Sequence, residues 1–448
     1  MTPLTRRYFL KSAGLSLFGV GLVPSFMRRT AFALEQSGRG LRKKVLVAVF
    51  QRGAADGLNI VVPFGDREYY SLRPSISIPE PSRISSRSET ALDLDGFFGF
   101  HPSLTSLKPL FDARHLAVIH AAGSPDSTRS HFDAQDYMES ATPGLKSTED
   151  GWLNRYLQKT PCPPMRALRS RASSDGAASA LEASETQVTP FRAVAFSPRM
   201  PRSLAGPAPA LAVDDLRSFR LGARVRARGA GGGEMQDALQ AMYASDPLMS
   251  GTARETFAAV STLQQIGVED YQPANGAEYP RGPLGRSLQQ VAQLIKADVG
   301  LEVAFAEVGG WDHHVNEGGV RGQLANSLKP FGDALAAFHR DMGDRMADIV
   351  VLTMTEFGRA ARENGNRGTD HGHANAMFVL GGPVRGGEVY GKWPGLEPGR
   401  LFEGRDLALT TDFRDVFAEV LVRHLGASET ASIFPGFVAS PHRFRGFL

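Results

Sequence analysis

The chain has little cysteine: Cys162 is the single one in 448 residues. One cysteine cannot form an intramolecular disulfide, so a small disulfide-stabilised scaffold is excluded. The sequence also has no Gly-rich dinucleotide-binding fingerprint after a strand-like run, which leaves little support for an oxidoreductase. Stability must therefore come from a hydrophobic core, and a chain of this length is long enough to build a large one.

Acidic residues are missing from residues 1–33, which carry five basic ones. The stretch TRRYFLK at residues 5–11 matches the twin-arginine export signal, and the small residues around Ala33 form a cleavage site. The apolar run between them, residues 12–23, is shorter than the roughly 20 residues that span a bilayer, which argues against a membrane anchor. We expect a signal peptide cleaved after about Ala33, the twin-arginine translocase as partner during export, no membrane span afterwards, and a periplasmic or secreted protein.

The basic character of the chain belongs largely to this signal. The whole chain has a formal charge of +3, and removing the five N-terminal basic residues leaves −2. The arginines at 220–228 stand beside glycines without interleaved aromatic residues, which is typical of a solvated loop. We therefore expect no nucleic-acid partner.

Two stretches lack the apolar periodicity that burial requires. Residues 165–190 are rich in Ser and Ala, and residues 224–233 are rich in Arg and Gly. We interpret both as flexible insertions in a single large domain that covers residues 34–448. Two smaller domains are the alternative that the length allows.

Around these stretches, strand-like runs alternate with helical patterns. Continuous apolar strands separated by helices predict a three-layer α/β/α fold with a mostly parallel central sheet. The expected strands are 44–50, 115–121, 191–196, 301–308, 349–355 and 376–380, and the expected helices are 235–267, 284–297, 321–347 and 411–425.

Polar residues follow four of these strands, where an open parallel sheet binds its ligands. Each of these groups also has a structural alternative. Asp56 before Gly57 suits a turn, and Glu356 suits the surface or a pair with Arg359. Ser130 suits a helix N-cap, which is compatible with a functional role, because a phosphate would bind at the positive end of the helix dipole. The residues at the four strand ends are Asp56; Ser130 with His131; Asp312, His313 and His314; and Glu356 followed by Asp370, His371 and His373.

The stretches WDHH and TDHGH hold four of the chain's 11 histidines. Asp and His are ligands that suit zinc, manganese or iron. Residues two apart in an extended segment point to one side, so Asp312 with His314, and His371 with His373, form two potential pincers. The alternative is a pair of hydrogen-bonded polar loops. The clustering favours a divalent metal site.

Six ordered blocks give the chain a resemblance to a known family. The blocks VFQRGAADGLNIVVPFGDREYYSLRPSISIP, SHFDAQDYMES, DGWLNRYL, GGWDHH, TEFGR and GTDHGHAN resemble those of the secreted bacterial domain-of-unknown-function family 1501. The resemblance runs from about Lys43 to the C-terminus. That family is sulfatase-like and distantly related to the alkaline phosphatase superfamily, so the resemblance implies an alkaline phosphatase/sulfatase-like fold.

The superfamily relationship implies two metals with a hydroxyl nucleophile between them. By position, Asp56 resembles the ligand after the first strand, Ser130 the nucleophile, Asp312 with His314 a ligand pair, and His371 or His373 the downstream histidine. One position departs from the pattern, because Phe357 stands where the superfamily has a ligand. Asp370 with His371 would replace the missing pair, or one metal would remain.

The resemblance therefore implies an exported, metal-dependent hydrolase of phosphate or sulfate esters. The expected cofactor is one or two ions of zinc, manganese or calcium, and the expected substrate is an anionic small-molecule or polysaccharide ester. The alternative is a non-catalytic binding or assembly protein on a degenerate hydrolase scaffold. The expected catalytic residues are Ser130, His131 and Arg129, with Arg52, Arg129 or Arg359 as a forked donor to the anion; the expected metal ligands are Asp56, Asp312, His314, Glu356, Asp370, His371 and His373.

Overall fold

A computed structural model describes residues 43–82, 89–160, 189–217 and 271–448 of the chain. Within it, Lys44–Leu448 forms one compact unit. The expected signal peptide, the helix expected at 235–267, the insertion at 224–233 and nearly all of the insertion at 165–190 lie outside the described residues.

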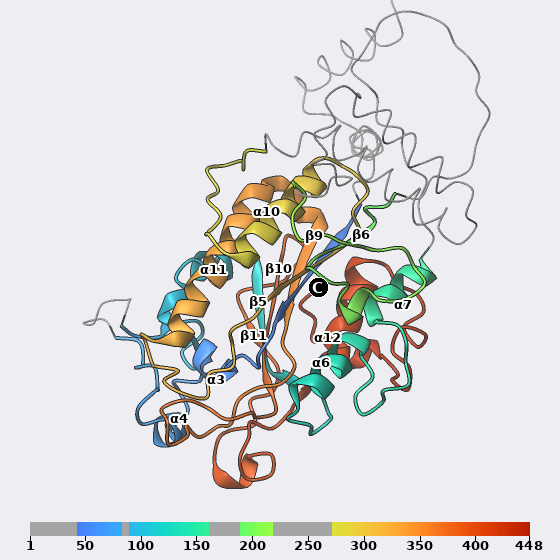
Figure 1. The fold of residues 1–448 in the computed structure, drawn as a ribbon. Coiled ribbons are helices and arrows are strands. Elements are labelled where there is room, and N and C mark those ends of the chain that lie inside the picture. Colours follow the sequence, from blue (N-terminus) through green and yellow to red (C-terminus); the bar gives the residue numbers. More distant parts are fainter. Residues whose placement is uncertain (1–42, 83–88, 161–188, 218–270) are drawn as a thin grey trace, which may run out of the picture. The chain divides into compact units, whose positions relative to one another are not determined.

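One large sheet organises the described residues (Figure 1). Its order is β11-β5-β10-β9-β1-β8-β6-β7, and β12 also pairs with β5. Every strand runs in one direction except β10, which is antiparallel to β5 and β9. The strands are β1 (Val45–Gln51), β5 (Leu116–Gly123), β6 (Ala193–Phe196), β7 (Leu211–Ala212), β8 (Val303–Val308), β9 (Ile349–Met354), β10 (Asn375–Gly381), β11 (Val389–Tyr390) and β12 (Thr411–Asp412).

Helices cover both faces of this sheet. A small second sheet has the order β2-β4-β3. The helices are α3 (Gly57–Ile60), α4 (Arg67–Leu72), α5 (Lys108–Asp112), α6 (His131–Ser140), α7 (Trp152–Lys159), α10 (Pro283–Lys296), α11 (Gln323–Met342) and α12 (Phe413–Glu419), and the small strands are β2 (Val61–Val62), β3 (Leu92–Asp93) and β4 (Gly99–Phe100).

The central strand β1 shows how the two faces are separated. Val47 and Val49 lie in one hydrophobic cluster with side chains of α10 and α11. Leu46 and Phe50, which alternate with them, lie in another cluster with side chains of α7 and α12. Alternation along a strand sends neighbouring side chains to opposite faces, so an unbroken apolar run marks a strand buried on both sides. The predicted α/β class with a large, mostly parallel sheet is confirmed.

All six expected strands lie in this sheet. Five of them are parallel to one another, and the one expected at 376–380 is antiparallel. Asn375–Gly381 runs antiparallel between β9 and β5. The expected helix at 411–425 begins only at Phe413, because the Asp412 side chain accepts a hydrogen bond from Arg414 N and caps the helix there. Within the described residues, no helix combines the length and apolarity that crossing a membrane requires.

Two histidines inside the fold are held in the neutral form. In His101 and His120, Nδ1 accepts a backbone N–H, from Ser103 and Ala121 respectively. In each ring Nε2 faces a backbone carbonyl, that of Gly319 at 3.1 Å or Val61 at 3.0 Å, and so donates to it. A second ring proton would displace the backbone donor. Burial lowers the pKa of both histidines to about 4.

We predict that the protein loses stability as the pH falls from about 6.5 to about 4. In this window the unfolded chain binds a proton at His120 and the native chain does not, so protonation favours unfolding. The free energy of unfolding should fall by about 2 kcal/mol per such histidine between pH 7 and pH 5. Urea unfolding of the wild type and of His120→Gln at both pH values measures this. A variant with an unchanged pH dependence would show that His120 titrates normally.

Candidate metal centre

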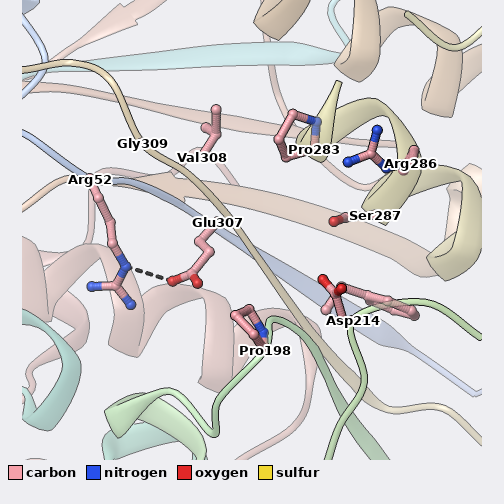
Figure 2. Close-up of a pocket in the computed structure, with 10 residues that line it drawn as sticks. Arg52, Pro198, Asp214, Pro283, Arg286, Ser287, Glu307, Val308 and Gly309 are labelled. Atoms are coloured by element: carbon pink, nitrogen blue, oxygen red, sulfur yellow. Dashed lines mark hydrogen bonds and ion pairs between the residues drawn. The ribbon is translucent and has the colours of Figure 1, made fainter. Parts of the chain in front are cut away.

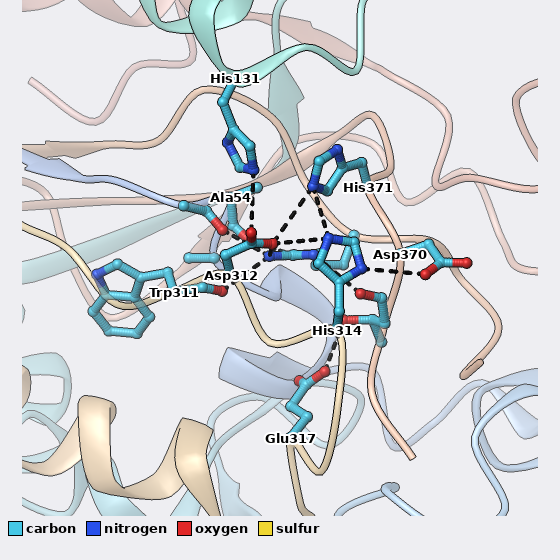
Figure 3. A network of polar contacts seen from close by, with 12 residues as sticks. Ala54, His131, Trp311, Asp312, His314, Glu317, Asp370 and His371 are labelled. Atoms are coloured by element: carbon cyan, nitrogen blue, oxygen red, sulfur yellow. Dashed lines mark hydrogen bonds and ion pairs between the residues drawn. The ribbon is translucent and has the colours of Figure 1, made fainter. Parts of the chain in front are cut away.

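Polar side chains from three strand ends meet at the carboxyl edge of the large sheet (Figure 3). His131 is the first residue of α6, which follows β5; Asp312 and His314 follow β8; and His371 lies in the connection between β9 and β10. Because β5, β8 and β9 run in the same direction, their carboxyl ends share one edge. These four residues are called the His/Asp cluster below.

The histidines of the cluster surround the Asp312 carboxylate. Oδ1 of Asp312 lies 3.0 Å from Nε2 of His314 and 3.4 Å from Nε2 of His371. Oδ2 lies 3.6 Å from Nε2 of His131, and Nε2 of His314 and His371 are 2.9 Å apart. One ligand atom from each of His131, Asp312 and His371 lies within 4.8 Å of the other two. This spacing suits coordination of a single ion.

Hydrogen bonds on the outer side of two rings set their tautomers. Nδ1 of His371 lies 2.8 Å from the carbonyl oxygen of Arg129, and Nδ1 of His131 lies 2.8 Å from Oε1 of Glu356. A carbonyl or carboxylate oxygen only accepts, so each Nδ1 carries a proton, and in the neutral ring each Nε2 turns a lone pair to the cluster. The hydrogen bond from Glu356 raises the pKa of His131 despite its partial burial, so a metal ion would compete with a proton for this Nε2. Nε2 of His131 is buried and has no hydrogen-bond partner. An unpaired acceptor of this kind fits a metal ligand.

Glu356 supports His131 instead of facing the cluster. Its carboxylate is buried and accepts hydrogen bonds from Gly53 N at 2.9 Å, Gln135 Nε2 at 2.8 Å and Thr355 Oγ1 at 3.0 Å, besides His131. Burial raises the pKa of Glu356, but the hydrogen bonds from His131 and Gln135 outweigh it and hold the pKa below its usual range. Glu356 therefore stays ionised and holds the proton on His131 Nδ1.

Phe357 and Gly53 shape the site without contributing ligand atoms. The Phe357 ring packs 5.0 Å from the rings of both His131 and His371, so it forms an apolar wall beside them. Gly53 adopts a φ of +119°, and a Cβ there would lie 2.8 Å from the backbone nitrogen of Asp312. A side chain at this position would push the two loops apart.

Arg359 is a buried cation against the cluster. Its guanidinium donates to the carbonyls of Gly53, Ala54 and Thr369, and Nη2 lies 2.5 Å from Asp312 Oδ1. Partial burial raises the pKa of Asp312, but the hydrogen bond and charge of Arg359 outweigh it and lower the pKa. Asp312 is therefore ionised, with Oδ1 shared among Arg359 and two histidines and Oδ2 turned toward His131.

Asp56, an expected metal ligand, lies outside the cluster. It is buried in a two-point ion pair with Arg73, with Nη2 at 2.9 Å from Oδ1 and Nη1 against Oδ2. Arg73 also donates to the carbonyls of Ala360 and Ala361. Burial raises the pKa of Asp56, but the charge and hydrogen bond of Arg73 outweigh it and lower the pKa. A guanidinium thus stands where the resemblance implies a metal.

Glu317 lies behind this pair and was not anticipated from the sequence. It is fully buried and accepts a hydrogen bond from Thr369 Oγ1 at 2.7 Å (Figure 3). Burial, together with the negative charge of Asp56 and a hydrogen bond to it, raises the pKa of Glu317 well above the usual range. The raised pKa favours the protonated form of Glu317, which limits the negative charge beside Asp56.

The expected catalytic residues Ser130 and Arg129 have structural contacts. Ser130 caps α6, and its Oγ accepts from Asp133 N at 3.5 Å. The Arg129 guanidinium binds Asp406 and Glu403, the latter at 2.7 Å, so only its carbonyl contacts the cluster. The other two arginines expected to bind an anion are also paired: Arg52 with Glu139 and Glu307, and Arg359 as described above.

The remaining expected ligands lie at the margin. Asp370 is more than half exposed and lies 3.3 Å from Nδ1 of His314, on the side away from the cluster. The His373 ring stacks on Phe402 with a centroid distance of 4.1 Å, and burial lowers its pKa. Of the expected site residues, the structure therefore brings together His131, Asp312, His314 and His371.

One supporting residue left a signal in the sequence that was missed. Gln135 stands four residues after His131, so both lie on one face of α6 and reach Glu356 together. No comparable signal marks Arg73, because its partner Asp56 lies 17 residues away along an irregular path.

The atoms of the cluster indicate which ion fits. Two or three imidazole nitrogens and one carboxylate oxygen suit zinc, and also manganese or iron. Calcium takes six to eight oxygen ligands, which this set does not supply. His131, Asp312 and His371 would hold the ion, with His314 beside them, and zinc fits better than calcium.

We predict that His371→Ala and Asp312→Ala abolish metal retention, because each removes one of the three atoms that would hold the ion. Elemental mass spectrometry of the protein, purified without a chelator or a histidine tag, measures the metal content. His373→Ala is the matched control, since this ring lies in the same loop but stacks on Phe402. Far-UV circular dichroism should show an intact fold in all three variants. Full metal content in Asp312→Ala would contradict this assignment.

Comparisons with known proteins point to one family. Neither the curated proteins nor the solved structures contain a match to this chain. The model of the family described as "Protein of unknown function (DUF1501)" matches residues 43–433, which include all the residues of the His/Asp cluster. This match covers most of the chain and agrees with the resemblance of the six sequence blocks. The chain therefore belongs to the DUF1501 family.

Proposed function

We propose that this protein is a metal-dependent hydrolase of phosphate or sulfate esters, with the fold of the alkaline phosphatase and sulfatase enzymes. The observation that carries the proposal is the pair of imidazole Nε2 atoms, of His131 and His371, that turn toward the Asp312 carboxylate with their tautomers set from outside. The mostly parallel sheet and the position of the cluster at its carboxyl edge support the finer fold assignment.

A bound divalent ion would activate a water molecule and polarise the ester oxygen. The protein groups around it have separate roles. Glu356 holds the Nδ1 proton of His131, and Arg359 keeps Asp312 ionised. Phe357 excludes water from one side of the imidazoles. These contacts hold the ligands before substrate arrives, so little reorganisation is needed during the reaction.

His314 is the group best placed to move a proton to the leaving oxygen. Its Nε2 lies within the cluster, its Nδ1 faces the Asp370 carboxylate at 3.3 Å, and its side chain is 40% exposed. A histidine oriented by a carboxylate and open to solvent is the usual form of a general acid or base. Ser130 is assigned no chemical step here, because its hydroxyl caps α6.

We predict that His314→Gln keeps the metal but lowers kcat about 100-fold, since a general acid contributes roughly that much. His371→Ala should lose both metal and activity, and Ser130→Ala should keep most of its activity. Turnover of aryl phosphates, phosphodiesters and aryl sulfates with added zinc or manganese measures this. Loss of turnover in Ser130→Ala, with the metal retained, would instead make the serine the nucleophile. Wild-type turnover in His314→Gln would contradict the proton-donor role.

A non-catalytic binding or assembly protein is the second candidate. The observations that favour it are Phe357, which has no ligand atom at an expected ligand position, and Arg73, which neutralises Asp56. Because neither position supplies a free ligand atom, the described site has ligands for one ion at most. A metal-loaded wild type that turns over no ester in the panel, yet binds a polysaccharide or protein partner tightly, would favour this candidate.

We also propose that the protein is exported by the twin-arginine pathway and cleaved after about Ala33. This proposal rests on the TRRYFLK motif. The pathway carries folded proteins, which would let the cluster take up its metal before export. We predict that replacing Arg6 and Arg7 together with lysine leaves the full-length protein in the cytoplasm. Cell fractionation and intact-mass measurement check this, and unchanged export of the double variant would contradict it.

A further inference from the structure

A second pocket opens at the same carboxyl edge of the sheet, on the side of β8, β6 and β7 (Figure 2). Its volume is about 340 Å³, within the range of small-molecule sites. It is lined by Glu307 near the end of β8, by Asp214 after β7 and by the first turn of α10. The pocket is therefore built from strand ends and a helix N-terminus, as ligand sites in parallel sheets commonly are.

One charged pair in the pocket wall is already satisfied. Nε of Arg52 lies 2.6 Å from Glu307 Oε2, and Ser197 Oγ donates to Glu307 Oε1 at 2.7 Å (Figure 2). Arg52 also binds Glu139 at 2.9 Å and donates to Gln135 at 3.0 Å. These contacts use the hydrogen-bonding groups of Arg52 and Glu307, so neither side chain is open to a ligand, and the two carboxylates leave one negative charge in excess on this wall.

Three other polar side chains in the pocket are free. Within the described parts of the chain, the side chains of Arg286, Ser287 and Asp214 have no hydrogen-bond or ion-pair partner. The Ser287 residue is 8% exposed, and its unpartnered hydroxyl is directed into the pocket, where a ligand can reach it (Figure 2).

The donors for an anion lie at the α10 end of the pocket, away from the carboxylates of Glu307 and Asp214. α10 is 14 residues long, and its N-cap residue, Gly282, provides no side-chain cap. The first turn of such a helix carries partial positive charge from unpaired amide groups. Pro283, Arg286 and Ser287 are spaced so that one helix face presents an apolar ring, a guanidinium and a hydroxyl to the pocket. Asp214 lies opposite them, and its carboxylate can accept hydrogen bonds from hydroxyl groups of a ligand.

We propose that this pocket binds a single sugar-sized ligand with one anionic group. The anionic group accepts hydrogen bonds from Arg286, Ser287 and the amide groups at the start of α10. Hydroxyl groups of the ligand donate to Asp214. The proline rings of Pro198 and Pro283 offer apolar surface to the carbon skeleton. A guanidinium, a hydroxyl and a carboxylate around apolar rings are the elements that recognise a phosphorylated or carboxylated sugar.

This site is distinct from the His/Asp cluster, although the two are neighbours. Gly309 lines the pocket and stands three residues before Asp312. Arg52 reaches Glu356 through Gln135. The proposal does not rest on the hydrolase assignment, because none of the three side chains that would bind the ligand (Arg286, Ser287 and Asp214) contacts the His/Asp cluster.

Calorimetric titration of the full mature protein tests the proposal with glucose 6-phosphate, glucuronate and neutral glucose as probes. We expect one-to-one binding of at least one charged probe and weaker binding of glucose. Arg286→Gln and Ser287→Ala should each weaken the charged probe about tenfold or more, as the loss of a charge-assisted hydrogen bond does. Arg340→Gln is the matched control, an exposed helical arginine of α11 whose side chain has no partner in the described residues. It should bind like the wild type.

Asp312→Asn separates this site from the metal cluster. Binding that survives in Asp312→Asn but falls in Arg286→Gln supports the proposal, whether or not the protein hydrolyses any ester. Three outcomes would overturn it: no saturable binding of either charged probe at millimolar concentration, equal binding of glucose, or binding lost in Asp312→Asn and kept in Arg286→Gln.

Discussion

The site depends on one buried guanidinium, that of Arg359. It donates to the carbonyls of Ala54 after β1, Trp311 after β8 and Thr369 before β10, and to the Asp312 carboxylate. A buried cation is tolerated only where its donors are paired, so this set of acceptors must form together. Arg359 thereby holds three loops together at the carboxyl edge of the sheet. Its backbone also forms an antiparallel bridge with that of His371.

Two carboxylates next to buried arginines show how similar pairs acquire different roles. The Asp312 side chain is 44% exposed and keeps one oxygen, Oδ2, turned toward His131. The Asp56 side chain is 2% exposed, and both its oxygens bind Arg73. Metal binding needs an oxygen with access and a lone pair to spare. Only Asp312 of the two meets this condition, which is why a single ion suits this scaffold.

Two groups of polar side chains with different chemistry lie at the carboxyl edge of the sheet. The His/Asp cluster offers nitrogens and one oxygen to a cation, while the first turn of α10 with Arg286 and Ser287 offers donors to an anion. Arg52 separates them: paired with Glu139 and Glu307, it closes the pocket wall and supports Gln135 behind the cluster.

Much of this could be read from the chain alone. Unbroken apolar runs such as Val45–Gln51 mark strands buried on both faces, because burial on both sides permits no polar alternation. Because parallel strands end at the same edge of a sheet, the histidines and carboxylates that follow those runs were expected to lie together. His131, Asp312, His314 and His371 do so. The tertiary structure alone determined which of these polar residues lie together in the His/Asp cluster. Arg73, Arg359 and Glu356 reach partners up to 306 residues away, and pairings over such distances leave no period or spacing in the sequence.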